Sequence, residues 1–137
     1  MAFADGQTSA TIFYGESPAS IKLAGTVVKG DAIGYSGGWK RALATVGTAI
    51  QMRCVAGEDG VSGQTITAYF GFCIVGGDRF SGGTAGSSVY VAESTSNGMY
   101  TETAPSTTGD CTKIVGIVFD ATTLHLYPFK NNDSIAT

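Results

Sequence analysis

The sequence predicts an all-β protein, because short β-rich runs alternate with glycine-containing turns and no helical period extends through the chain. Of the 137 residues, 20 are glycine and only 3 are proline. Glycines scattered between short apolar runs mark tight turns and bulges rather than a flexible linker. We therefore expect a small β-barrel or a two-sheet sandwich, and closure into a barrel would leave no exposed sheet edge.

The first half of the chain supplies a series of strand candidates separated by turns. Ile21 and Leu23 alternate with polar neighbours, which is the period of a half-buried strand. Residues 36–38 (Ser-Gly-Gly) form a hairpin turn. Residues 42–50 are the best place for a helical turn. The strands expected here are residues 11–14, 20–23, 26–28, 32–35, 39–42, 50–55 and 65–75, of which the last is a long apolar run suited to a central strand.

The second half repeats this organisation, most clearly between residues 82 and 128. Residues 96–98 (Ser-Asn-Gly) turn the chain between two short runs, and an apolar run ends shortly before a final strand. The strands expected here are residues 89–91, 99–103, 113–119 and 123–128. The plan of a strand, a glycine turn and an aromatic-led return strand occurs in residues 29–42 and again in residues 85–101.

The length suits one domain, since a chain of this size buries roughly 70% of the surface that its unfolded form exposes. We expect an extended N-terminal arm over residues 1–11, a single β-barrel domain over residues 12–129 and a C-terminal tail over residues 130–137. The first residues lack the basic and apolar segments of a signal peptide. No apolar run approaches the ~20 residues that span a membrane, so we expect a soluble protein made in a cytoplasm.

The composition predicts an assembly component. Charged residues make up 14% of the chain, below the roughly 25% of an average globular protein, and the mean hydropathy is positive. Part of the surface is therefore expected to lie against other subunits. A net charge of −3 argues against nucleic-acid binding, and the basic pair Lys40-Arg41 is expected to be a solvated strand end.

Residues that could support catalysis or metal binding are few and scattered. His125 lies between Leu124 and Leu126, so it should face away from them, and no G-x-S-x-G nucleophile motif accompanies it. The sequence therefore predicts no catalytic residue, no metal site and no cofactor; a small hydrolase built on acidic loop residues is the weakest alternative.

The remaining polar and aromatic candidates have structural interpretations. The cysteines lack metal-ligand spacing and are expected to be reduced and buried, with one disulfide left open; they are Cys54, Cys73 and Cys111. Four aspartates in glycine-containing loops are expected to form turns; they are Asp31, Asp59, Asp78 and Asp110. Tyr69 and Tyr90 are expected to pack on the sheet, and Trp39 or Tyr127 to contact another subunit.

Several of these stretches resemble the small β-barrel modules of tailed-phage virion proteins, which occur in capsid decoration (cement) proteins and in head or tail fibre proteins. The resemblance covers roughly residues 25–129. It rests on Gly30-Asp31-Ala32-Ile33, Gly38-Trp39-Lys40-Arg41-Ala42, and residues 84–91, 98–105, 109–110, 113–118 and 124–128. The short length, without a repeated shaft, favours a decoration protein.

The resemblance implies a non-enzymatic virion protein that is made in the host cytoplasm and stabilises the head from the outer capsid surface. Its expected partners are the major capsid protein and further copies of itself, as a homotrimer, without nucleic acid or membrane. An arm of this kind would add a strand to a neighbour and be dispensable for folding. The expected contact residues are Phe3, Ile12, Phe13, Trp39 and Tyr127. The alternative function is a head or tail fibre or receptor-binding module.

Overall fold

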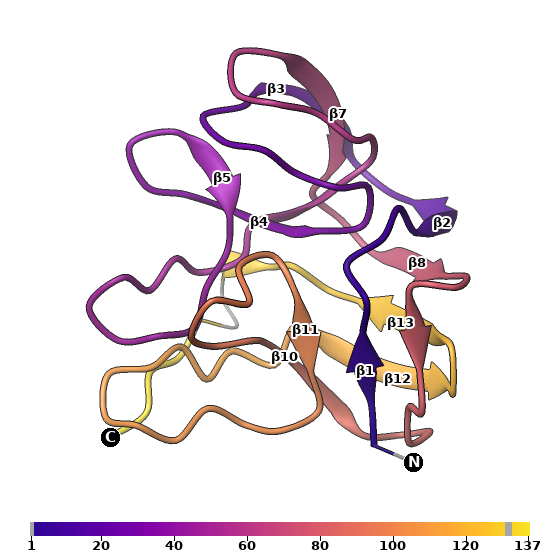
Figure 1. Ribbon diagram of the computed structural model, residues 1–137, viewed down its shortest axis with the longest axis vertical. Coiled ribbons are helices and arrows are strands. Elements are labelled where there is room, and N and C mark those ends of the chain that lie inside the picture. Colours follow the sequence, from indigo (N-terminus) through magenta and orange to yellow (C-terminus); the bar gives the residue numbers. More distant parts are fainter. Residues whose placement is uncertain (1, 131–132) are drawn as a thin grey trace.

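The computed structural model describes residues 2–130 and 133–137. Within these residues the chain forms 13 strands and no helix (Figure 1), which confirms the all-β prediction. The strands make three antiparallel sheets of six, five and two strands, which pack as a sandwich. Each sheet keeps two edge strands among the described residues, so no barrel closes and the barrel alternative is wrong.

The six-stranded sheet has the strand order β11-β10-β12-β13-β8-β2. Its strands are β2 (Thr11–Gly15), β8 (Cys73–Gly76), β10 (Ser88–Val91), β11 (Tyr100–Thr101), β12 (Gly116–Asp120) and β13 (Thr123–Leu126). Alternating side chains give this sheet two different faces. Leu124 and Leu126 are buried in the main core, together with Val118 on the neighbouring strand, and the residues between them face outward.

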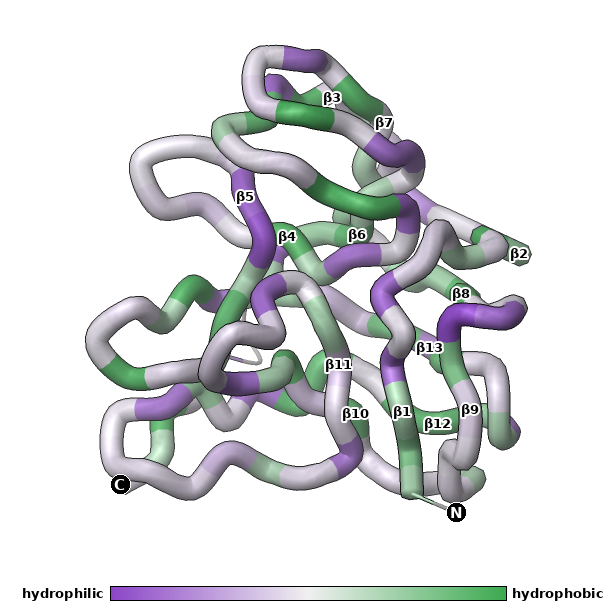
Figure 2. The backbone as a smooth tube through the Cα atoms, viewed as in Figure 1, coloured by the Kyte–Doolittle hydropathy of each residue, from purple (hydrophilic) through white to green (hydrophobic). Residues whose placement is uncertain are grey.

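The five-stranded sheet has the order β3-β7-β6-β4-β5 and is covered on both faces near its centre. Its strands are β3 (Pro18–Lys22), β4 (Ala32–Tyr35), β5 (Trp39–Arg41), β6 (Cys54–Ala56) and β7 (Thr65–Tyr69). Val55 packs into the main core against the six-stranded sheet, whereas Cys54 and Ala56 pack into a second core on the opposite side. This double burial explains why hydrophobic residues follow one another along β6 without polar interruption (Figure 2).

The N-terminal segment belongs to the folded body, so the extended arm expected for residues 1–11 is not confirmed. β1 (Ala4–Asp5) pairs with β9 (Phe80–Ser81) and lies between β9 and β11 (Figure 2). The ring of Phe3 stacks on that of Phe80 at 6.0 Å, and the Asp5 side chain is fully buried. At the other end, residues 133–137 run along residues 109–112, with a bridge between Cys111 and Ile135.

The expected central strand over residues 65–75 is in fact two strands in different sheets. The chain leaves β7 at Tyr69 and enters β8 at Cys73, while the neighbouring β2–β3 segment crosses beside it. The two crossings are joined by hydrogen bonds from Glu16 N–H to Phe72 O (3.0 Å) and from Phe70 N–H to Ser17 O (3.1 Å). They form a bent two-stranded ribbon that links the sheets at a corner.

Two further expectations are wrong in detail. Residues 42–50 contain no helical turn; Leu43 and Ile50 exchange backbone hydrogen bonds (2.8 and 3.1 Å) and close a loop that contains Gly47 at a φ of 87°. Residues 26–28 form no strand, since Val27 makes only an isolated bridge to Gly60. Both segments are spacers whose apolar side chains fill the core without extending a sheet.

Candidate interaction surface

The outer face of the six-stranded sheet carries aromatic side chains where a solvated sheet would carry polar ones. The alternation along β13 places His125 opposite Leu124 and Leu126, as the sequence predicts, and pairs it with Ile117 on β12 and Ile74 on β8. The aromatic residues of this face, here called the aromatic face, are Tyr14, Phe72, Phe119, His125, Tyr127 and Phe129.

These rings contact one another in a continuous series. His125 stacks on Phe119, with ring centroids 4.7 Å apart and planes within 3° of parallel. On its other side it meets the edge of Phe72 at 5.4 Å. Phe72 in turn stacks on Tyr127 at 4.9 Å and lies 5.9 Å from Tyr14. Such pairs stabilise each other beyond the area that they bury, so the rings hold one another in a fixed arrangement.

Much of this aromatic surface is open to solvent. Phe119 is 57% exposed, Tyr14 is 47% exposed and Phe129 is 43% exposed. The hydroxyl of Tyr14 donates to Glu16 Oε2 (2.7 Å), and this hydrogen bond raises the pKa of Tyr14, so the phenol stays neutral. Contiguous exposed apolar surface on a folded protein marks a site of interaction more often than a free surface.

An apolar groove of about 370 Å³ continues the aromatic face toward the C-terminal segment. It shares Tyr127 with the aromatic face and is lined by Thr112, Ile114, Gly116, Ile117, Tyr127 and Ser134. Ile114 and Ile117 are both exposed within it. The groove can accept an apolar side chain of a partner, while the few hydroxyl groups at its edge offer hydrogen bonds.

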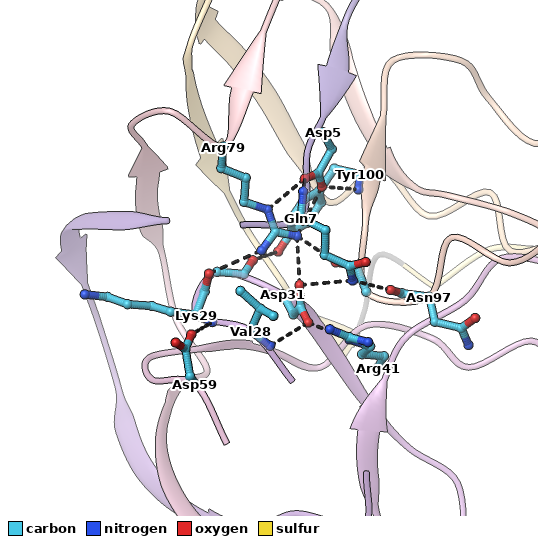
Figure 3. Close-up of polar contacts among 12 residues, drawn as sticks. Asp5, Gln7, Val28, Lys29, Asp31, Arg41, Asp59, Arg79, Asn97 and Tyr100 are labelled. Atoms are coloured by element: carbon cyan, nitrogen blue, oxygen red, sulfur yellow. Dashed lines mark hydrogen bonds and ion pairs between the residues drawn. The ribbon is translucent and has the colours of Figure 1, made fainter. Parts of the chain in front are cut away.

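A buried network of charged side chains fixes the N-terminal segment at the other side of the main core (Figure 3). The Arg79 guanidinium binds the Asp5 carboxylate through two nitrogens, at 2.8 and 3.1 Å, and binds Asp31 Oδ1 at 2.8 Å. Asp31 also accepts from Arg41 Nε at 2.7 Å. The Tyr100 N–H donates to Asp5 Oδ2 (3.0 Å), and burial raises the pKa of Tyr100 well above its usual value.

This network balances two carboxylates against two guanidinium groups, and its role is structural. Asp31 accepts from Val28 N–H (2.8 Å), so its predicted turn-forming role is confirmed, but the ion pairs to Arg79 and Arg41 were not anticipated. The sequence around Asp5 and Arg79 gave no signal of burial, because each residue lies in a short polar stretch. Only the pairing of β1 with β9 brings them together.

The five predicted contact residues do not form one surface. Phe3 and Ile12 are partly buried against the main core, whereas Phe13 is 60% exposed at a bulge in β2. Trp39 is half-buried between Tyr35 and Phe70, at 5.1 and 5.5 Å, and packs against the second core. Tyr127 alone belongs to the aromatic face.

Sequence reasoning placed His125 on the outward face of its strand but missed Tyr14, Phe72, Phe119 and Phe129 as members of the aromatic face. The signal was available in β12 and β13, where Ile117, Phe119 and His125 occupy the positions opposite the buried residues. No local pattern could have added Phe72, because it lies in the crossing between two sheets.

The residues that could bind a metal ion remain scattered within residues 2–130 and 133–137. No group of three or more His, Cys, Asp or Glu side chains in this part of the chain could hold a metal ion. All three cysteines are free and buried, as expected, and burial raises the pKa of Cys54 and of Cys73 to about 12. These thiols therefore carry no nucleophilic thiolate near neutral pH.

The acidic loop residues serve the backbone. Asp110 accepts from the N–H groups of Val46 (2.8 Å) and Thr107 (3.1 Å), and these bonds contribute to lowering the pKa of Asp110. Asp59 accepts from Lys29 N–H at 2.7 Å. The bond from Thr107, three residues earlier, gives Asp110 the turn-forming role expected for it, whereas Asp59 joins its loop to the distant Lys29 backbone.

Comparison with known proteins gives no relative. No protein-family model matches the chain, and neither the curated proteins nor the solved structures contain a match. Among the described residues, none forms a helix with the length and apolar character needed to cross a membrane.

Proposed function

We propose that the protein is a structural protein of a tailed-phage virion, which decorates the outer surface of the capsid and stabilises the head. The observation that carries the proposal is the aromatic face, an ordered and exposed apolar surface on a chain with few charges. The resemblance of its strand and turn pattern to virion β-modules supplies the class of particle. The low charge content of the whole chain supports an assembled rather than a freely solvated protein.

In this proposal the aromatic face binds the major capsid protein, and the apolar groove beside Tyr127 receives a side chain from it. Self-association into a homotrimer uses the second exposed aromatic site, where Tyr35 is 61% exposed above Trp39. The capsid is stabilised by mass action. Because the protein binds only the assembled shell, it lowers the free energy of the shell by RT ln(1 + [L]/Kd) at each site.

The experiment compares binding of variants to purified capsids of the phage that encodes the chain. The double variant Phe119→Ser with Phe129→Ser removes two exposed rings that take no part in the main core. We expect it to remain folded and to lose occupancy by at least about tenfold, since buried aromatic anchors dominate interface energetics.

The matched control is Val61→Ser, which removes an exposed apolar side chain from the loop before β7. It should bind capsids as the unmodified protein does. Full occupancy by the double variant, or an equal loss in the control, would overturn the aromatic face as the capsid-binding surface. Failure of the unmodified protein to bind any capsid would overturn the proposed function itself.

A further inference from the structure

A polar cleft of about 300 Å³ lies above the buried network, on a different part of the molecule from the aromatic face. It is lined by Gln7, Gly25, Thr26, Lys40, Arg41, Ile50, Thr95 and Asn97. Two of these residues also belong to the network, because Gln7 and Arg41 both bind Asp31 (Figure 3). The floor of the cleft is therefore fixed by buried ion pairs, as a pre-formed binding site requires.

The cleft carries a surplus of positive charge. Below it, the two carboxylates of Asp5 and Asp31 are balanced by Arg79 and Arg41. Lys40 forms no ion pair with any carboxylate of the described residues, so its charge is not compensated. An anion entering the cleft would be attracted by this lysine and by the outer part of the neighbouring guanidinium.

Arg41 is held in a way that leaves a planar pair of donors available. Its bond to Asp31 uses Nε alone, and the side chain remains 26% exposed. The two terminal nitrogens of a guanidinium match the two oxygens of a carboxylate. Arg41 is already paired with Asp31, so the cleft has one uncompensated positive charge, that of Lys40. This charge suits a singly charged carboxylate better than a doubly charged phosphate.

The other lining groups suit hydroxyls. The Asn97 side-chain amide and two threonine hydroxyls offer both donors and acceptors, and Ile50 gives one apolar wall. The Gln7 amide offers its oxygen as an acceptor, because its nitrogen already donates to Asp31 and to the Asn97 backbone. The Gln7 side-chain amide is positioned by donating to the backbone oxygen of Asn97 (2.6 Å), while the Gln7 backbone adopts a φ of 51°. A left-handed backbone at a residue other than glycine is uncommon and occurs preferentially at functional sites.

We infer that this cleft binds a small carboxylate-bearing sugar, of the hexuronate class. The carboxylate lies between Lys40 and the terminal nitrogens of Arg41, and the ring hydroxyls bind the amides of Gln7 and Asn97. The inference does not depend on the proposed capsid role, because the cleft and the aromatic face share no residue.

The test is titration calorimetry of the intact protein with glucuronate, alongside glucose as the neutral counterpart and inorganic phosphate as the alternative anion. We expect glucuronate to bind at least about tenfold more tightly than glucose, because a charge-assisted pair contributes more than a neutral hydrogen bond. Phosphate should bind more weakly than glucuronate. No detectable glucuronate binding, equal binding of glucose, or tighter binding of phosphate would overturn the inference.

Variants assign the binding to the cleft. Lys40→Gln keeps a polar side chain, one atom shorter, and removes its charge, and we expect about a tenfold loss of glucuronate affinity with an unchanged melting temperature. Lys22→Gln, on exposed β3 outside the cleft, is the matched control and should leave the affinity unchanged. An equal loss in the two variants would show that only the overall charge matters and would overturn the site.

Discussion

Burial of the charged Arg79 side chain destabilises the folded protein, whereas its ion pairs stabilise it. Removing a guanidinium from water costs several kcal/mol, and only close, hydrogen-bonded partners offset that cost. Arg79 has two carboxylate partners within 3.1 Å and also donates to the backbone oxygens of Lys29 and Gly98. The network therefore depends on every partner, because removal of one leaves a charge buried without compensation.

This dependence predicts the effect of Asp5→Ala. Loss of the two-nitrogen contact leaves Arg79 with excess positive charge in a buried site and frees the Tyr100 N–H. We expect the free energy of unfolding to fall by about 3–5 kcal/mol, measured by urea denaturation. For the same reason we predict that deletion of residues 2–10 destabilises the fold, whereas the arm expected from the sequence would be dispensable for folding.

The control for Asp5→Ala is Arg53→Gln, which breaks the partly exposed ion pair with Asp133. That change should cost no more than about 1 kcal/mol. If Asp5→Ala is no more destabilising than Arg53→Gln, the buried network does not anchor β1.

Among the elements, the hairpin of β12 and β13 was the most predictable. Alternation between buried Val118, Leu124 and Leu126 and the outward residues between them fixes both the strands and their faces. The run over residues 65–75 was less predictable, because it stays apolar through a corner at which the chain changes sheets. The side chains before and after this corner are both buried and therefore apolar, so the hydrophobic pattern does not show where the chain bends.

Close backbone approach within this hairpin predicts the effect of Gly116→Ala. A methyl group at Gly116 would overlap the backbone oxygen of His125 on the paired strand, and a backbone atom cannot move aside as a side chain can. We expect a loss of about 1–3 kcal/mol in the free energy of unfolding, typical of overpacking. Thermal denaturation followed by circular dichroism measures it.

Gly25→Ala is the matched control for this substitution. A Cβ there would meet only Lys40 Cβ at 3.6 Å, which is ordinary van der Waals contact. Its effect should stay within about 0.5 kcal/mol. Equal stability of the Gly116→Ala protein and this control would mean that β12 can move away from β13 without cost.

On the scale of the whole molecule, the two large sheets are joined by the chain crossings between β2 and β3 and between β7 and β8, as well as by a shared core. The chain offers one reporter in each sheet, since Trp39 is the single tryptophan and His125 the single histidine. We expect the urea midpoint from Trp39 fluorescence to coincide with that from the His125 proton resonance, as for a two-state domain. Separate midpoints would show that the sheets unfold independently.

The composition predicted the kind of surface better than its position. Few charges and a positive mean hydropathy indicated an interacting protein, and the aromatic face is an apolar surface of that kind. Its members come from β2, β12, β13 and the segments beside β8 and β13, so they are assembled by strand order rather than by neighbours in sequence. The residues that line the polar cleft likewise come from distant parts of the sequence, since Gln7 and Asn97 meet only after β1 has paired.

The location of β1 also governs the order in which the protein can form during synthesis. Asp5 and Arg79 are 74 residues apart, so during synthesis β1 must wait until Arg79 has been made before its partner exists. Pairings of such high sequence separation form slowly, because the entropy of closing the loop is lost before any contact is gained. Until then the apolar side chains of the preceding strands lack part of their cover, and exposed apolar surface of this kind favours aggregation.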